Sequence, residues 1–204
     1  MWPAVDLLFP VSCAGCDAPG SAWCAVCAEG VCLEPVDTPI DGVARCFAVA
    51  PYDGGVGRAL RRAKYGRDRR RMRLLAELFA HHAAPLAFGL DWIVPIPSPW
   101  TRRLSRGFSG AALLADALSR RTGIPLRSAL TLLPGARQAG LDARLRGVNL
   151  GGRMRSTGPA PGRVLLVDDV LTTGATAAAA ARELLGDETA RITVVVLTAA
   201  TRRS

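Results

Sequence analysis

The sequence predicts a mixed α/β domain with a mostly parallel sheet flanked by helices, preceded by a small cysteine-rich module. Two observations carry this prediction. Residues 1–35 are dense in cysteine, proline and glycine, whereas from about Ala44 onward apolar runs alternate with amphipathic stretches. Apolar strands that alternate with helices are typical of a parallel sheet covered on both faces. We expect a cysteine-rich zinc-binding module over residues 1–40 and one α/β domain over residues 41–204.

The expected elements follow from apolar periodicity and from breaker residues. Strands are predicted at 45–51, 92–96, 128–133, 164–167 and 192–198, and helices at 57–62, 70–82, 109–121 and 173–185. Ligands of parallel sheets bind beyond the carboxyl ends of the strands. The loops after Val94, Leu133 and Val167 are therefore the expected ligand-binding loops.

The charge distribution indicates an anionic partner. The chain has 26 basic residues against 17 acidic ones, and Lys64 is its one lysine. Residues 58–73 combine Asp68 with nine cations, which are Arg58, Arg61, Arg62, Lys64, Arg67, Arg69, Arg70, Arg71 and Arg73. Such a segment attracts nucleic acid or a multiply phosphorylated small molecule, and the plainer alternative is a solvated helix face.

Neither export nor membrane insertion is indicated by the apolar segments. Residues 1–10 have no cationic stretch before their apolar residues, and the run 192–200 has about half the length of a membrane span. We expect a cytoplasmic protein without membrane insertion. In a reducing compartment, six cysteines favour metal binding over disulfides.

Four cysteines have the spacing of a metal site. Cys13, Cys16, Cys24 and Cys27 form two C-x-x-C pairs that are seven residues apart, a spacing at which four thiolates can surround one Zn²⁺. Four thiolates leave no open position for water, so the predicted zinc is structural. Cys46 is interpreted as a small buried strand residue.

The strongest functional signal is RVLLVDDVLTTGAT at residues 163–176, where a buried strand leads into two acids, a turn and a helix. Paired carboxylates can accept hydrogen bonds from ribose hydroxyls or help hold a hydrated divalent ion. A helix N-terminus favours a phosphate through its free N–H groups and its dipole. The expected binding residues are Asp168, Asp169, Val170, Leu171, Thr172, Thr173, Gly174, Ala175 and Thr176. The alternative is that these residues merely cap the helix.

This motif resembles the signature with which type I phosphoribosyltransferases bind 5-phosphoribosyl-1-pyrophosphate (PRPP). The resemblance implies a type I phosphoribosyltransferase-like fold and Mg²⁺ bound with PRPP. It also implies that Asp168 and Asp169 face the ribose hydroxyls and that residues 172–176 cradle the 5-phosphate. Purine-salvage members usually have an aspartate at the position of Thr172, so nucleobase salvage is the weakest functional alternative.

Further motifs resemble the ComF and GntX family, whose members have a type I phosphoribosyltransferase-like domain and an N-terminal four-cysteine zinc knuckle. They are the cysteine-rich N-terminus, VPIPSPWTRRLSRGF at 94–108, RQAGL at 137–141 and RGVN at 146–149. The family usually has Arg-Gly-Phe-Asn-Gln where this chain has RGFSG at 106–110, so two amide side chains are missing. Arg153 and Met154 also stand where Ala and Phe are usual.

Arginines after the proline-rich turn suit a pyrophosphate. Pro97, an expected substrate-binding residue, lies in this rigid turn, and Arg102, Arg103 and Arg106 follow it. The alternative is a surface loop with solvated arginines. By the resemblance, Arg137 and Gln138 would lie in the segment that closes over substrate in this superfamily.

Two functions of different class remain open. The first is a Mg²⁺-dependent phosphoribosyltransferase in which Asp168, Asp169, Arg102 and Arg106 stabilise the developing sugar cation and the leaving pyrophosphate. The second is a non-catalytic, PRPP-responsive accessory protein that binds single-stranded DNA through residues 58–73. The ComF resemblance implies a role in DNA uptake and competence, with competence or DNA-processing proteins as further partners.

Overall fold

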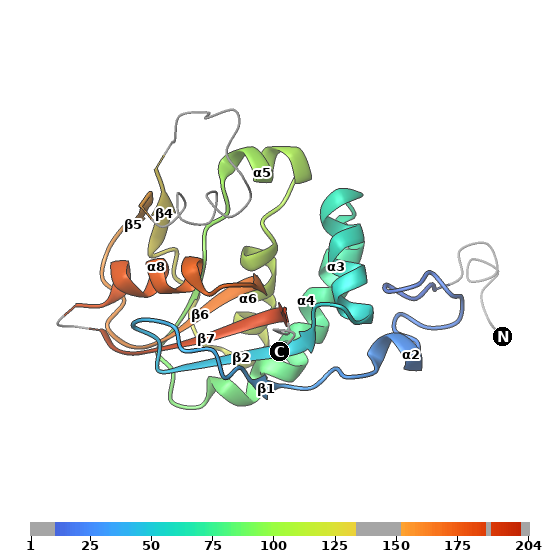
Figure 1. Cartoon of the computed structure of the whole chain (residues 1–204), viewed down its shortest axis with the longest axis horizontal. Helices are drawn as coiled ribbons and strands as arrows, with labels where there is room; N and C mark the ends of the chain where they lie inside the picture. Colours follow the sequence, from blue (N-terminus) through green and yellow to red (C-terminus); the bar gives the residue numbers. More distant parts are fainter. Residues whose placement is uncertain (1–10, 134–151, 187–188, 201–204) are drawn as a thin grey trace.

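A five-stranded sheet forms the centre of the computed structural model, which describes residues 11–133, 152–186 and 189–200 (Figure 1). Its order is β1-β2-β7-β6-β3, with β1 (Glu34–Pro35), β2 (Arg45–Pro51), β3 (Trp92–Pro95), β6 (Gly162–Leu171) and β7 (Thr189–Ala199). The short edge strand β1 is antiparallel to β2, and the other neighbours are parallel. The predicted mixed α/β fold with a mostly parallel sheet is confirmed.

Helices cover both faces of this sheet (Figure 1). One face carries α3 (Gly55–Tyr65), α4 (Arg69–Ala83), the 3-10 helix η1 (Ala84–Ala87) and α6 (Gly110–Thr122), and the other carries α8 (Ala175–Leu184). The core is divided in the same way, since Leu165 and Val167 pack with the first group of helices and Val164 and Leu166 pack with α8. Successive side chains of β6 thus alternate between the two faces.

Capping residues fix where the helices begin and end. The Asp68 carboxylate accepts a hydrogen bond from the Arg71 N–H at 2.8 Å where α4 begins, and Ser109 caps α6 through the Ala112 N–H. The φ of 76° at Gly123 ends α6 in the left-handed conformation that favours glycine. The four predicted helices are confirmed, with ends shifted by a few residues.

Two strands differ from the prediction. The strand expected at 128–133 is β4 (Leu130–Leu132), which pairs with β5 (Met154–Ser156) in a separate two-stranded sheet. The loop after Leu133 therefore does not follow a strand of the main sheet, because strand pairing depends on partners that are distant in the sequence. The strand expected to end at Val167 continues to Leu171, because its last residues pair with Thr198 and Ala199 of β7.

The segment after Pro99, which was expected to belong to a rigid proline turn, forms a short helix, α5 (Trp100–Arg106). None of the described helices is long and apolar enough to cross a membrane. The N-terminal region contains α2 (Ala25–Ala28), and Ile40 packs in the core beside α8. The division into units 1–40 and 41–204 stays a prediction.

Candidate functional site

The connection from β6 to α8 forms a small recess at the carboxyl end of a central strand. Gly174 is the N-cap of α8 with a φ of 78°, a left-handed conformation that L side chains adopt with strain. The Thr173 hydroxyl accepts a hydrogen bond from the Ala175 N–H at 3.4 Å. The recess is lined by Asp168, Val170, Leu171, Thr172, Gly174, Ala175, Thr176, Ala177 and Val196. Seven of the nine binding residues predicted within 168–176 therefore line this recess, and Asp169 and Thr173 do not.

The two adjacent aspartates lie on opposite faces of the sheet. Asp168 is two residues from Leu166 on β6, so its side chain points to the same face and lines the recess beside α8. Asp169 is two residues from Val167 and points to the other face, toward α3 and α6. An Asp168 carboxylate oxygen accepts a hydrogen bond from the Asp169 N–H at 2.7 Å. The acidic pair therefore straddles the end of β6 instead of projecting from one face.

Asp169 is held between two helices. Its Oδ1 accepts a hydrogen bond from Nζ of Lys64 on α3 at 2.7 Å, and each of the two side chains is 13% exposed. On the other side, a Cβ atom added at Gly110, the first residue of α6, would overlap Oδ2 of Asp169. An alanine at residue 110 would therefore require the Asp169 carboxylate to move.

Sequence reasoning did not place Lys64 in the site. Lys64 lies 105 residues from Asp169 in the chain, and it was grouped with the cations of residues 58–73. The available signal was composition, because this one lysine stands in a chain whose other basic residues are all arginine. The contact with Asp169 depends on the fold, which brings α3 to the end of β6.

The other predicted site residues are only partly described. Pro97 is half-buried between β3 and α5, and Arg106 is partly exposed at the end of α5. Arg102 lies on the same helix, but its side chain falls outside the described part of the chain. Arg137 and Gln138 lie outside the described residues. The pyrophosphate-binding and catalytic roles assigned to these arginines stay predictions.

The four predicted metal ligands come together as a cluster. The sulfur atoms of Cys13, Cys16, Cys24 and Cys27 all lie within 4.8 Å of one another. The Cys24 sulfur is 3.6 Å from that of Cys13 and 3.7 Å from that of Cys16. Four sulfurs around Zn²⁺ at the usual bond length are about 3.8 Å apart, so the geometry fits a tetrahedral ion. The predicted grouping of these four cysteines is confirmed.

The thiols of this cluster have divergent acidities. Burial raises the pKa of Cys27 to about 12, and hydrogen bonds with the neighbouring thiols add to the effect. Burial also acts to raise the pKa of Cys13, but hydrogen bonds from the backbone of Cys24, Cys16 and Gly15 outweigh it and lower that pKa to about 6. A thiolate-binding metal would stabilise the deprotonated form of all four.

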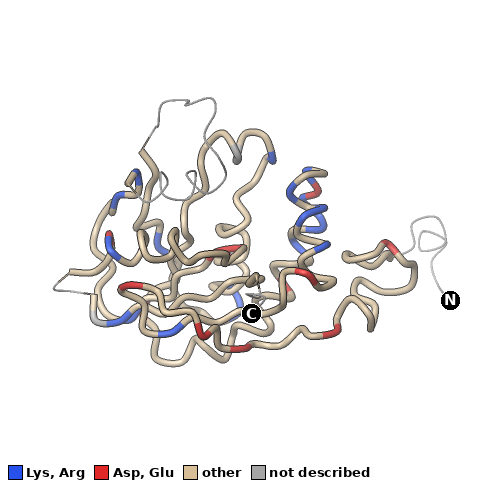
Figure 2. Tube along the Cα trace, viewed as in Figure 1, with Lys and Arg blue, Asp and Glu red and all other residues tan. Residues whose placement is uncertain are grey.

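The cysteine module is docked on the basic helices. Nη2 of Arg58 donates to the Cys27 sulfur at 3.7 Å, and Nη1 of Arg62 donates to the Asp17 carboxylate at 2.6 Å. Arg71 of α4 also pairs with Asp17. Figure 2 shows the concentration of basic residues along α3. Part of the basic segment 58–73 is therefore committed to intramolecular contacts.

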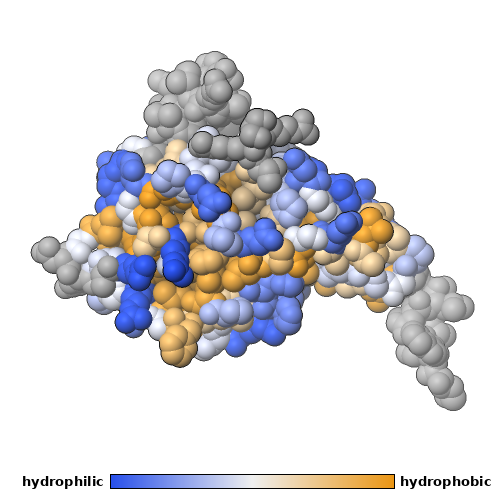
Figure 3. Space-filling model, turned by 60° about the horizontal axis from the view of Figure 1, so that its bottom comes forward, coloured by the Kyte–Doolittle hydropathy of each residue, from blue (hydrophilic) through white to orange (hydrophobic). Residues whose placement is uncertain are grey.

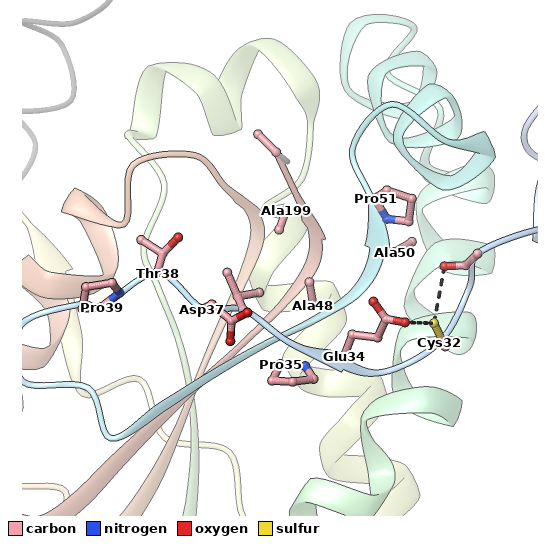
Figure 4. A pocket seen from close by; sticks show the side chains of 13 residues that line it. Cys32, Glu34, Pro35, Asp37, Thr38, Pro39, Ala48, Ala50, Pro51 and Ala199 are labelled. Atoms are coloured by element: carbon pink, nitrogen blue, oxygen red, sulfur yellow. Dashed lines mark hydrogen bonds between the residues drawn. The ribbon is translucent and has the colours of Figure 1, made fainter. Parts of the chain in front are cut away.

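A larger groove of about 580 Å³ lies beside the edge strand β1 (Figure 4). Its lining includes Glu34, Pro35, Asp37, Ala48 and Ala199, and apolar surface spreads across the same side of the molecule (Figure 3). The Cys32 thiol donates to Glu34 at 3.1 Å, and this hydrogen bond raises the pKa of Cys32. Two acids and no basic side chain line the groove, which makes it unsuited to a polyanion.

The fold and the described site define a mixed α/β protein with a mostly parallel sheet, a recess at the end of β6 and a four-cysteine cluster able to hold a metal. Two similar solved structures are phosphoribosyltransferases. Orotate phosphoribosyltransferase from Aeropyrum pernix matches with a TM-score of 0.41 and 20% identity. The match covers 66% of this chain and 63% of the orotate enzyme, so less than two thirds of that enzyme is matched. The adenine enzyme from Leishmania donovani has a TM-score of 0.45 and 10% identity over 83% of this chain and 89% of its own.

Sequence comparison identifies nearer relatives. The DNA utilization protein YhgH of Escherichia coli K12 is 37% identical over 159 residues, which cover 74% of this chain and 70% of that protein. The protein of the same name from Shigella flexneri is 36% identical over the same share of both chains. No family model matches the sequence. The chain belongs to the family of the DNA utilization protein YhgH.

Proposed function

We propose that this chain is a PRPP-binding protein of the ComF type, in which the recess between β6 and α8 holds the 5-phosphate. The observation that carries the proposal is the convergence of Asp168 and residues 170–172 and 174–176 on one recess, at the carboxyl end of a parallel strand and the N-terminus of a helix. Both features favour a phosphate ester. The exposed acids of the groove beside β1, Glu34 and Asp37, do not favour a phosphate ester.

The chemistry of the recess suits a sugar phosphate. Backbone N–H groups at the start of α8 and the threonine hydroxyls are donors for phosphate oxygens. The Asp168 carboxylate is an acceptor for a ribose hydroxyl. Mg²⁺ bound with PRPP would neutralise pyrophosphate charge, and Arg102 and Arg106 on α5 would stabilise the departing pyrophosphate in an enzyme that transfers the phosphoribosyl group.

Isothermal titration of PRPP and Mg²⁺ into the zinc-loaded protein tests this proposal. Asp168→Asn keeps the size of the side chain and removes its charge, and affinity is expected to fall by about 10- to 100-fold, as for the loss of a charge-assisted hydrogen bond. Asp116→Asn is the matched control, because Asp116 is an exposed acid of α6 that pairs with Arg120. Absence of binding to the intact protein, or equal binding by Asp168→Asn, would refute the proposal.

A second candidate function is binding of single-stranded DNA, and the observation that favours it is a patch of exposed arginines at the α3–α4 turn. Arg67, Arg69, Arg70 and Arg73 are exposed, and none of them has an ion pair within the described part of the chain. Their charge is therefore available for phosphates. The name of the relatives, DNA utilization protein, agrees with such a role.

Fluorescence anisotropy with a labelled single-stranded oligonucleotide tests the DNA proposal. Replacing these four arginines by glutamine is expected to weaken binding and to reduce the slope of log affinity against log salt by about 3, since each phosphate contact in a single strand contributes about 0.7. Arg120→Gln, which changes a cation already paired with Asp116, is the control. An unchanged salt slope in the quadruple variant would assign DNA binding to another surface or exclude it.

We further propose that the four-cysteine cluster binds one structural Zn²⁺. Four sulfur donors at tetrahedral spacing match the preference of zinc for thiolates. The contact from Arg58 to Cys27 then orients one ligand and balances part of the negative charge of a four-thiolate site. A cytoplasmic location, in which these cysteines stay reduced, is part of this proposal.

A further inference from the structure

The one lysine of the chain lies at the end of β6, on the face opposite the phosphate recess. Its ammonium is 2.7 Å from Oδ1 of Asp169, and its side chain is 13% exposed. An ammonium has three N–H donors, of which this contact uses one. Because the side chain keeps a path to solvent at the carboxyl edge of the sheet, the remaining donors are accessible to a ligand bound there.

Stability alone does not explain a lysine at this position. A nearly buried ion pair loses much of its hydration, and replacing such a pair by apolar side chains is often neutral or stabilising. Arginine fills every other basic position of the chain, including the contacts to the cysteine module. Lysine differs by its compact charge and by rotatable donors on a flexible stem. These properties suit a group that contacts Asp169 and a ligand oxygen at once.

The position of Lys64 is set by the packing of the part of its helix that precedes it. Leu60 and Ala63, which come before it on α3, are fully buried in the core. Arg58 and Arg62 of the same helix contact the cysteine module at Cys27 and Asp17. Its ammonium is therefore presented by a rigid element, which is what a precise contact to a ligand requires.

Placement on the two faces assigns the two ends of a ligand. The recess beside α8 offers backbone and hydroxyl donors for one phosphate, and Asp168, which lines that recess, accepts a hydrogen bond from the Asp169 N–H. A ribose that begins at the recess and crosses the end of β6 brings its anomeric substituent to the α3 face. We propose that Lys64 binds the pyrophosphate group of PRPP there, an inference that rests on the proposed function and adds a residue to its site.

Three probes separate the two ends of the ligand, and each is titrated by calorimetry with Mg²⁺ into the full, zinc-loaded chain. PRPP has both the 5-phosphate and the pyrophosphate. Ribose 5-phosphate has only the 5-phosphate, which is expected in the recess, and inorganic pyrophosphate tests the site at Lys64 alone. Lys64→Met removes the charge at similar length, and Lys64→Gln keeps an N–H donor for Asp169. Arg120→Gln, an exposed cation of α6, is the control. Thermal unfolding without ligand checks that each variant is folded.

We expect the Lys64 variants to lose affinity selectively for the probes that contain pyrophosphate. Both Lys64 variants bind PRPP and pyrophosphate about 10- to 100-fold more weakly, as for a lost charge-assisted contact, and bind ribose 5-phosphate as the intact protein does. Lys64→Arg recovers part of the pyrophosphate affinity because it restores the charge.

Two other results overturn the inference. If all three probes lose affinity equally, Lys64 only supports Asp169, and if pyrophosphate affinity is unchanged, Lys64 does not contact it. In the second case ribose 5-phosphate and PRPP still bind, so the proposed function stands. Failure of the intact protein to bind either sugar phosphate refutes the proposed function itself and removes the basis of the inference.

Discussion

At the carboxyl end of β6, the two faces of the sheet have different chemical environments. The α8 face has a loop of backbone donors and hydroxyls around Asp168, whereas the α3 face has an ion pair between Lys64 and Asp169 beside a docked cysteine module. The alternation of side chains along a strand allows consecutive aspartates to enter both environments. Adjacent acidic residues on a strand are therefore two separate groups, and the partners of each depend on which helix covers its face.

The largest expected effect is on the α3 face, through loss of the metal. Cys24→Ser removes the sulfur that lies 3.6 Å from that of Cys13 and 3.7 Å from that of Cys16, and we expect the bound zinc to fall from one equivalent to none. Structural zinc sites contribute on the order of 10 kcal/mol of binding free energy, so the module should lose its structure. Metal analysis measures the zinc, and hydrogen exchange should increase in α3 while α8 stays protected.

Cys32→Ser is the control for that experiment, because Cys32 is exposed and lies outside the cluster. It should retain one zinc. Retention of zinc by Cys24→Ser, or its loss from Cys32→Ser, would contradict the assignment of the four ligands. Equal loss of protection in α8 and α3 would break the distinction between the two faces.

A smaller effect is expected from filling the space between α6 and Asp169. Gly110→Ala places a methyl group against Oδ2 of Asp169, and we expect a loss of about 1–3 kcal/mol in the free energy of unfolding, as for overpacked sites. Gly186→Ala is the control, since a Cβ atom there meets nothing within 4 Å. Denaturant unfolding compares the two. Equal stability of both variants would show that Asp169 is not confined by α6.

The smallest effect concerns the groove beside β1, outside both faces. The hydrogen bond to Glu34 and the charge of that carboxylate raise the pKa of Cys32, so Glu34→Gln should lower this pKa. The thiolate fraction at pH 8 then increases, and alkylation of Cys32 becomes faster. Rates measured from pH 7 to 10 should shift to lower pH. Cys46, whose pKa burial raises to about 11, is the slow internal reference, and an unchanged profile would contradict the Glu34 contact.

Local sequence patterns predicted the parts of the site that are contiguous in the chain. Residues 168–176 carry their own strand end, turn and helix start, and Cys13 to Cys27 carry their own ligand spacing. The positions of the apolar strands along the chain were predicted for the same reason, whereas their order in the sheet was not predicted. The contact between Lys64 and Asp169 could not be predicted, because it depends on how α3 packs across the sheet. The residues of β4 were predicted, but its place in a separate sheet was not, because its partner, β5, lies more than 20 residues further along the chain.

The most direct test of the account is hydrogen exchange of the zinc-loaded protein with and without PRPP and Mg²⁺. We expect PRPP to protect the backbone of residues 172–177 at the start of α8 and to protect α3 around Lys64, while residues 32–37 of the groove exchange at an unchanged rate. Protection confined to the groove, or no protection of residues 172–177 at saturating PRPP, would contradict the placement of a phosphoribosyl ligand at the end of β6.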